Sequence, residues 1–278
     1  ICSISIDGSG NKWFGTDLGL AKFDGTNWTV FNSSNTPMPS SSIVTTEVEL
    51  NGVLCVGITG PGLALYNGTS WSMKNSSDNA ITDNYVQALD FDNSGTVWTG
   101  LRYGAAKLKN GVWTKYDKDN SGLPSNNISA IKVNENGSVW FGTYDAGLAV
   151  LVGDTTWQLH NITNSGLPNN DVRSIKIDHA GNMWIGTNGG GIAKYDGSNW
   201  TVYNISNSGM PSNWVFSMAE DKNGTKWIGS YGLAKFDGTN WTIFNSTTAG
   251  LPDNWIQSVA IDSNGTKWVA TYGGIGGY

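Results

Sequence analysis

One short pattern, Asp-x-x-Gly-x-x-Trp, recurs at nearly constant spacing and constrains the fold more than any other feature of the chain. Five copies are complete, and a sixth has Asn134 in place of the aspartate. The repeating units are 41 to 44 residues apart and begin at Ile1, Ile43, Val86, Ile128, Val172, Val215 and Ile256, and all but the unit at Ile43 carry the pattern. A period of about 40 to 45 residues is typical of a β-propeller blade built from four short strands.

The fifth unit shows how one repeat is expected to fold. Residues 172–178 alternate and are rich in β-branched side chains, which is typical of a strand. Further strands are expected at 183–187, 191–196 and 200–204, and 196–199 (Asp-Gly-Ser-Asn) is a hairpin turn. No segment keeps a 3.6-residue period, so we expect essentially no helix. The sequence therefore predicts an all-β, seven-bladed β-propeller with four-stranded antiparallel blades, in a single domain over 1–278.

The seventh unit is shorter than the others. It offers a first strand at 256–262, a second at 267–272 and a third at 273–278, and no fourth. Either residues outside 1–278 complete this blade, or its last strand is left as an exposed edge.

Tryptophan occupies two repeated places, one after the Asp-x-x-Gly turn and one at the start of the fourth strand. Of the 14 tryptophans, twelve stand at these places and are interpreted as packing residues. Trp214 and Trp255 stand outside the repeat, so they are candidates for another role.

Charge and cysteine content exclude several classes of protein. The net charge of −6 argues against nucleic acid as a partner. No apolar run approaches the ~18 residues of a membrane span, so no membrane insertion is expected. Cys2 and Cys55 are too few for a disulfide framework. Cys55 stands where other units place tryptophan, which favours a buried thiol, while a bridge between the two is left open.

Several units resemble the two-component regulator propeller repeat nearly verbatim. The resemblance rests on KWFGTDLGLAKFDGTNWTVF, on MWIGTNGGGIAKYDGSNWTVY and on the loop NSGLPSN, and it extends over the whole chain. It implies a bacterial, extracytoplasmic, seven-bladed propeller that is periplasmic, on the cell surface or secreted. In the sensor proteins of this family, such propellers recognise oligosaccharides.

Strand direction alternates within a unit, so the loops after the second and fourth strands share one face. We call it the variable face, because its loops are longer and differ between units, as ligand-binding loops on a rigid scaffold do. Aromatic rings mixed with Asp, Asn and Arg suit sugars, although such rings could also simply fill the junctions between blades. The candidate ligand-binding residues are Asp17, Tyr85, Arg102, Tyr103, Tyr144, Asp145, Arg173, Asn188, Trp214, Tyr231, Trp255 and Tyr272.

Catalysis and metal binding have weaker support in the sequence. His179 falls on the opposite face, and His160 is interpreted as a solvated histidine at the rim of its blade. Residues 117–122 begin like a calcium loop, but Ile128 stands where the loop needs Glu. We therefore expect no catalytic residue, no metal and no cofactor.

Three functions stay open. The first is a non-catalytic module that binds a glycan, either as a monomer or as one part of a larger chain. The second is a protein–protein interaction scaffold of a secreted or surface protein. The third is a polysaccharide hydrolase or lyase, for which Asp17, Asp145 and Asp171 are candidates by location alone.

Overall fold

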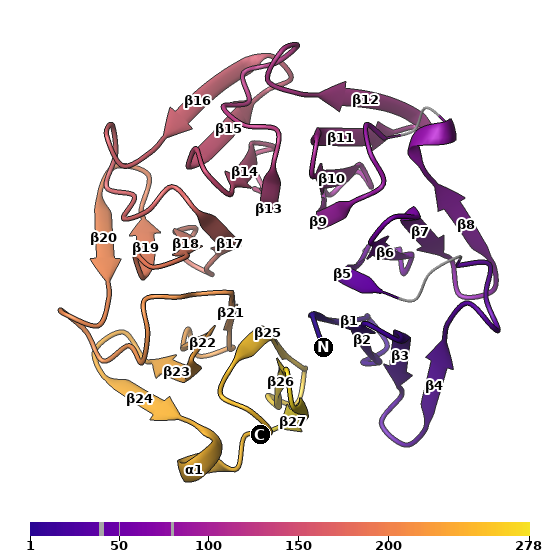
Figure 1. Cartoon of the computed structure of the whole chain (residues 1–278). Helices are drawn as coiled ribbons and strands as arrows, with labels where there is room; N and C mark the ends of the chain where they lie inside the picture. The colour runs from indigo at the N-terminus through magenta and orange to yellow at the C-terminus, as the bar shows by residue number, and fades with distance from the viewer. Residues whose placement is uncertain (39–41, 50, 79–80) are drawn as a thin grey trace. The chain divides into compact units, whose positions relative to one another are not determined.

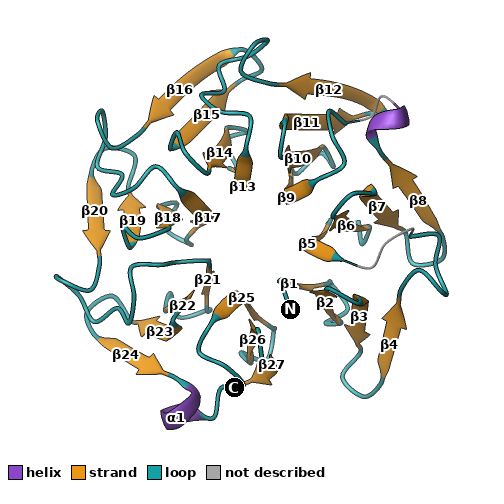
Figure 2. Cartoon of the chain, viewed as in Figure 1, coloured by secondary structure: helices purple, strands orange, loops and turns teal. Residues whose placement is uncertain are grey.

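The computed structural model describes residues 1–38, 42–49, 51–78 and 81–278 of the chain. Within these residues the secondary structure is almost entirely antiparallel β, arranged in seven sheets. Figure 2 shows that helix is confined to two short stretches, η1 (Ser76–Asp78) and α1 (Ser246–Ala249). Each sheet is one blade, which confirms the prediction of an all-β, seven-bladed β-propeller with essentially no helix.

Each sheet contains consecutive strands in chain order, as Figure 1 shows. The first three sheets contain β1 (Ser3–Ile6), β2 (Lys12–Thr16), β3 (Gly19–Phe23) and β4 (Trp28–Phe31); β5 (Ile43–Val48), β6 (Leu54–Ile58), β7 (Gly62–Tyr66) and β8 (Trp71–Lys74); and β9 (Val86–Phe91), β10 (Val97–Leu101), β11 (Gly104–Lys109) and β12 (Val112–Tyr116).

The fourth to sixth sheets contain β13 (Ile128–Val133), β14 (Val139–Thr143), β15 (Leu148–Val152) and β16 (Thr156–His160); β17 (Val172–Ile177), β18 (Met183–Thr187), β19 (Ile192–Tyr195) and β20 (Trp200–Tyr203); and β21 (Ser217–Glu220), β22 (Lys226–Ser230), β23 (Gly232–Phe236) and β24 (Trp241–Phe244). The seventh sheet has the three strands β25 (Ile256–Ile261), β26 (Lys267–Thr271) and β27 (Gly274–Gly277), as the sequence predicts.

The chain divides into two compact units, which are described separately. The N-terminal unit comprises residues 2–141 and 150–158, and the C-terminal unit comprises residue 1 with 142–149 and 159–278. In the N-terminal unit the first strands of neighbouring sheets pack together, β1 on β5, β5 on β9 and β9 on β13. In the C-terminal unit β17 packs on β21, and β21 on β25. The starts of the first strands are therefore neighbours within each unit.

The hydrophobic core lies between adjacent sheets. In the C-terminal unit Trp184 of β18 packs with Val215, Ile228 and Phe236 of the next sheet, and all four are buried. Trp13 occupies the same place between the first and second sheets. This position confirms that the tryptophan after the Asp-x-x-Gly turn fills the space between blades. Trp28, at the start of β4, packs on the rings of Phe23 and Phe14 and is still 54% exposed.

The Asp-x-x-Gly-x-x-Trp pattern is held together by the aspartate. In the fifth sheet Asp178 Oδ1 accepts the backbone N–H of Ala180 and of Asn182, as the sequence predicts for an Asp turn. Its other oxygen accepts the indole N–H of Trp184 at 2.8 Å, a bond that the sequence did not suggest. Burial raises the pKa of Asp178, but these hydrogen bonds and the charge of Lys226 outweigh it and lower the pKa overall.

The sequence predicts essentially no helix, and α1 is a single helical turn. Asn245 caps it, accepting the N–H groups of Thr247 and Thr248, and Gly250 ends it with a positive φ of 65°. Local side-chain caps, rather than an apolar period, therefore make this turn helical. Among the described residues no helix is long and apolar enough to cross a membrane.

Both cysteines are free thiols. Cys55 of β6 is fully buried, and Cys2 is half-buried. The structure therefore agrees with a buried thiol at position 55 and contains no bridge between the two.

Candidate ligand-binding face

The loops that lead into the third to seventh sheets end in the same way. An asparagine side chain accepts the backbone N–H of the residue eight positions earlier, which ties the end of the loop to its beginning. These asparagines are Asn84, Asn126, Asn170, Asn213 and Asn254. Leu or Met side chains within the loops are buried, for example Leu167 and Met210. The loops are thus tied down by hydrogen bonds and apolar anchors, although they lie outside the strands.

The residue after each of these asparagines is presented in a fixed position. Its backbone N–H is accepted by a side chain two residues earlier, for example Asp83 for Tyr85 and Asp253 for Trp255. The following residue is fully buried, as Val215 and Ile256 are. We call the residue after the asparagine the first display position, and its members are Tyr85, Asn127, Asp171, Trp214 and Trp255.

Two further positions lie beside it. The second display position is two residues further along the chain, and its members are Gln87, Ser129, Arg173, Phe216 and Gln257. The third follows the second strand of the preceding sheet, and its members are Thr59, Arg102, Tyr144, Asn188, Tyr231 and Tyr272. β-Bridges join the third position to the first at Thr59 with Tyr85, at Asn188 with Trp214 and at Tyr231 with Trp255.

In the C-terminal unit these positions hold a polar cluster around Arg173. Arg173 Nη2 donates to Asp171 Oδ2 at 2.8 Å, and its Nε lies 2.7 Å from Asp171 Oδ1. The guanidinium carbon lies 4.4 Å from the ring centroid of Tyr144. Asn188 Nδ2 donates to Asp171 Oδ2 at 2.7 Å. One carboxylate thus organises an arginine and an amide, and the arginine lies over an aromatic ring.

The pKa of the Tyr144 hydroxyl is raised in this cluster. Burial raises the pKa of its hydroxyl, the nearby Arg173 charge acts against that, and the Asp171 charge adds to it. The net pKa is raised, so Tyr144 keeps its proton at neutral pH and serves as a neutral hydrogen-bonding group.

Next to the polar cluster, five aromatic side chains lie together around Trp255. Its ring centroid is 5.5 Å from that of Trp214, 5.3 Å from Phe216, 6.2 Å from Tyr231 and 6.1 Å from Tyr272. Three of the five are exposed: Trp214 by 44%, Tyr231 by 53% and Tyr272 by 68%. We call these five residues the aromatic platform. The Asn188–Trp214 bridge joins it to the polar cluster.

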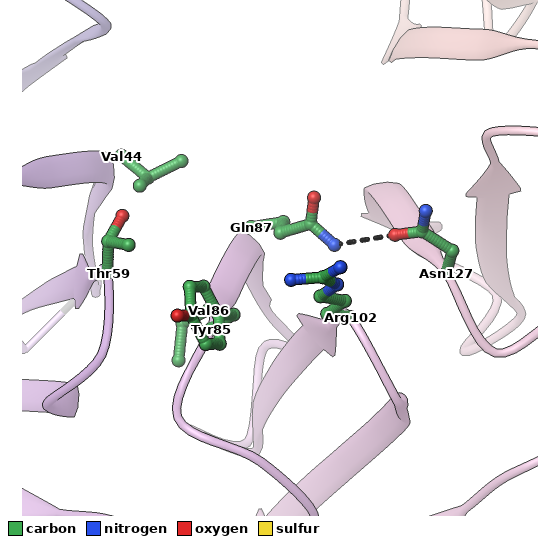
Figure 3. A pocket seen from close by; sticks show the side chains of 7 residues that line it. All are labelled: Val44, Thr59, Tyr85, Val86, Gln87, Arg102 and Asn127. Carbon is green, nitrogen blue, oxygen red and sulfur yellow. Dashed lines mark hydrogen bonds between the residues drawn. The ribbon is translucent and has the colours of Figure 1, made fainter.

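The N-terminal unit has its own arrangement around Arg102. Its guanidinium carbon lies 5.6 Å from the ring centroid of Tyr85 and 5.8 Å from that of Tyr103. Asp83 holds both tyrosines in place, because its two oxygens accept the backbone N–H groups of Tyr85 and Tyr103. A pocket of about 270 Å³ opens beside Arg102. Figure 3 shows its lining, Val44, Thr59, Tyr85, Val86, Gln87, Arg102 and Asn127.

The structure places the predicted site residues in two groups. In the C-terminal unit, Tyr144, Arg173, Asn188, Trp214, Tyr231, Trp255 and Tyr272 form one connected set. In the N-terminal unit, Tyr85, Arg102 and Tyr103 lie together. Asp145 is exposed beside Tyr144 in the β14–β15 loop, and Asp17 is exposed in the β2–β3 turn.

The list of candidates lacks several residues that the structure adds. Gln87 and Asn127 line the pocket at Arg102, and Phe216 belongs to the aromatic platform. The motif Asn-x-(Val/Ile)-x, which ends the loops into the third to seventh sheets, could have located all three, because it alternates displayed and buried residues.

The two histidines lie elsewhere. His160 is half-buried and packs against the rings of Tyr195 and Trp200, and burial lowers its pKa. His160 lies at the end of β16, as predicted. The prediction that its side chain is solvated is wrong, because two rings pack against it. His179 lies beside Glu220, which accepts its backbone N–H.

The calcium-like segment forms a turn that uses its own acid. Asp117 Oδ1 accepts the N–H groups of Asp119 and Asn120, and its Oδ2 accepts Asn120 Nδ2. Asn161 makes the equivalent bonds to Thr163 in the next loop, without any acid. Within the described ranges, no group of three or more His, Cys, Asp or Glu is placed to hold a metal ion.

Three segments of the chain, 122–145, 166–189 and 209–232, match the family described as two component regulator propeller. The matched segments span the end of each loop, the following two strands and the third display position. This match confirms the resemblance seen in the sequence. No curated protein is significantly similar to the chain.

The fold is similar to several solved structures. The extracellular domain of a protein described as a hybrid two component system from B. thetaiotaomicron is 26% identical, with a TM-score of 0.84, over 99% of this chain and 39% of that one. PorZ, a surface component of the type-IX secretion system of Porphyromonas gingivalis, is 19% identical, with a TM-score of 0.80, over 99% and 46%. The chain therefore spans less than half of either protein.

An enzyme shares the fold at lower identity. A catalytically inactive histidine-to-alanine variant of virginiamycin B lyase from Staphylococcus aureus, solved with quinupristin, is 11% identical. Its TM-score is 0.78, over 99% of this chain and 92% of that one. At this identity the likeness shows the fold alone.

Proposed function

We propose that this chain, which carries two component regulator propeller repeats, is an extracytoplasmic propeller that binds an oligosaccharide on its variable face without transforming it. The observation that carries the proposal is the aromatic platform. Trp214, Tyr231 and Tyr272 are exposed, and all three rings lie around that of Trp255. A contiguous set of exposed rings on a soluble surface marks a binding site.

The chemistry of the platform and its neighbours suits a sugar. The CH faces of a pyranose pack on aromatic rings, and its hydroxyl groups need donors and acceptors at the edge of the stack. The polar cluster supplies both, through Asn188, Asp171 and Arg173. Because Asp171 and Arg173 neutralise each other, this part of the face favours neutral hydroxyl groups over a charged ligand.

Binding without turnover is supported by the surroundings of the histidines. The virginiamycin B lyase variant that lacks one histidine is inactive. Here His160 is packed against Tyr195 and Trp200, and His179 lies in the β17–β18 turn beside Glu220. Neither belongs to the polar cluster or the aromatic platform, so we propose that the chain has no lyase activity.

The extracytoplasmic location is supported by the similarity to an extracellular domain of a hybrid two component system. In such a system, a propeller that binds a ligand would pass the signal to further domains. Because this chain spans 39% of that extracellular-domain chain, signalling by the whole protein belongs to the proposal.

Trp214→Ala and Tyr272→Ala test the proposal, with Trp28→Ala as the matched control. Trp28 is also an exposed indole, at 54%, but it lies at the start of β4 in a repeated position. A glycan array identifies the best ligand, and calorimetry measures its affinity for each variant. We expect the two platform variants to lose at least about tenfold in affinity, or about 1.4 kcal/mol, and the control to bind as wild type does.

The same experiment separates the proposal from its alternatives. Equal affinity of Trp214→Ala, Tyr272→Ala and wild type contradicts a glycan site on the platform. A protein partner captured by the wild type and by both variants, with no glycan bound, favours the scaffold function. Turnover of a bound polysaccharide, lost in Asp145→Asn, favours an enzyme.

A further inference from the structure

We propose that the pocket at Arg102 in the N-terminal unit binds an anionic group, a carboxylate or a sulfate on a sugar. The inference rests on the proposed oligosaccharide-binding function and adds the chemical class of the ligand. It starts from a contrast between the only two arginines of the chain, Arg102 and Arg173.

The two arginines have different partners. Arg173 is paired with Asp171, and both carboxylate oxygens of Asp171 lie against its guanidinium. Arg102 is exposed, its guanidinium lies within 6 Å of the ring centroids of both Tyr85 and Tyr103, and no carboxylate of the described chain pairs with it. A guanidinium beside aromatic rings keeps its charge and its donors available to a ligand.

Asp83 is the acid closest to this site in sequence, and its oxygens are already used. One accepts the N–H of Tyr85 and the other accepts the N–H of Tyr103. Thr82 Oγ1 also donates to the backbone oxygen of Tyr103. These bonds fix the two tyrosines that flank Arg102, so Asp83 builds the frame of the subsite.

The pocket lining contains no acidic side chain. Gln87 Nε2 donates to Asn127 Oδ1 at 2.9 Å, as Figure 3 shows, and this bond does not use Asn127 Nδ2. Arg102 and Thr59 supply further donors. A planar guanidinium beside neutral N–H and O–H donors matches the geometry of carboxylate and sulfate oxygens.

The size of the pocket limits what it holds. Pockets that enclose a drug-sized ligand have volumes of roughly 300–1,000 Å³. At about 270 Å³, this pocket suits one charged group or one sugar unit of a longer ligand. The net charge of −6 works against polyanions over the surface as a whole, so attraction is local to Arg102.

Calorimetry with three probes tests the inference. The probes are trigalacturonate, its neutral methyl ester and a sulfated neutral trisaccharide, which separate carboxylate from sulfate. Arg102→Gln removes the charge, and Arg102→Lys keeps the charge but removes the planar set of guanidinium donors. Lys109→Gln is the control. Lys109 is exposed at the opposite end of β11 from Arg102, so this control removes one positive charge from the same sheet.

We expect wild type to bind at least one charged probe about tenfold or more tightly than the methyl ester, and less tightly as salt is added. Arg102→Gln should abolish this preference, Arg102→Lys should keep part of it, and Lys109→Gln should keep all of it. A preference that survives Arg102→Gln, or wild type with no preference or no binding of a charged probe, overturns the inference.

The results for neutral glycans and for charged probes distinguish failure of the proposed function from failure of the inference about Arg102. If a neutral glycan binds and needs Trp214, the oligosaccharide function stands even where the charged-probe preference is absent. If charged probes need Arg102 while no ligand is affected by Trp214→Ala, the aromatic platform is not the site and the subsite at Arg102 stands alone.

Discussion

The guanidinium of Arg173 lies 4.4 Å from the ring centroid of Tyr144, although the two residues are associated with different sheets. Tyr144 follows β14, and Arg173 is the second residue of β17. The contact is possible because the end of one second strand and the start of the next first strand are neighbours on the variable face. Asp171 completes the group by pairing with Arg173.

Removing the charge of Asp171 should destabilise this group. Asp171→Asn leaves Arg173 and Asn188 without the carboxylate that both bind, and both are at least half-buried. We expect the free energy of unfolding to fall by about 1–3 kcal/mol, because a charged donor loses its partner. Urea denaturation measures the change.

Asp145→Asn is the matched control for this prediction. Asp145 is exposed in the β14–β15 loop, so the same substitution should change stability by no more than about 0.5 kcal/mol. Equal effects of the two substitutions would show that the Asp171–Arg173 pair contributes nothing to the fold.

Acid should weaken the fold through the aspartates of the repeated turns. The net pKa of Asp178 is lowered from 3.8, as is that of Asp7, because hydrogen bonds outweigh the effect of burial. Folding therefore gains stability from these carboxylates above about pH 4, and this gain is lost as pH falls through their lower folded-state pKa. Unfolding free energies measured from pH 6 to pH 2 should fall most steeply below pH 4.

Asp178→Asn should cost about 1–3 kcal/mol at neutral pH and make the acid part of this profile shallower. The exposed loop acid Asp119 serves as the control, since Asp119→Asn should leave the profile as in wild type. An unchanged slope in Asp178→Asn would contradict the role assigned to the turn aspartates.

Gly186 in the second strand of the fifth sheet should be needed because the next sheet packs too closely against it to leave room for a side chain. A Cβ at Gly186 of β18 would lie 2.7 Å from Val215 Cγ1 and 2.9 Å from the backbone oxygen of Val215. Gly186→Ala should therefore cost about 1–3 kcal/mol through overpacking. At Gly8 a Cβ would meet nothing within 4 Å, so Gly8→Ala should stay within about 0.5 kcal/mol of wild type. Thermal and urea denaturation of both variants check this difference.

The thiols should react only as the fold opens. Burial raises the pKa of Cys55, and the charges of Glu49 and Glu47 add to the effect, so its reactive thiolate is scarce in the folded protein. The pKa of Cys2 is also raised. A thiol reagent should not modify Cys55 in the native protein and should titrate both cysteines in denaturant without reductant. Fewer than two reactive thiols in denaturant would show a disulfide.

The fold could be predicted from the sequence because local, repeated sequence patterns specify it. The turn at Asp178, Gly181 and Trp184 recurs with the period of a blade, and local turn chemistry suffices to recognise it. Trp214 and Trp255 were singled out because they break the repeat, and the structure brings their rings within 5.5 Å of each other.

The pairings within the face could not be predicted in the same way. Phe216 lies directly before β21, and only the packing of β21 on β25 in the C-terminal unit brings it to Trp255. The bond from Gln87 to Asn127 likewise joins residues 40 positions apart on neighbouring sheets. Such contacts depend on how sheets pack, which no local pattern specifies.

The indole N–H signals of the tryptophans test the central claim most directly. With the signals assigned from single Trp→Phe variants, a titration with the best neutral glycan should shift those of Trp214 and Trp255. Those of Trp184 and Trp227, whose N–H groups are bound to Asp178 and Asp221, should stay in place. Saturable binding that shifts the signal of Trp28 while leaving those of Trp214 and Trp255 unchanged would contradict a ligand site on the aromatic platform.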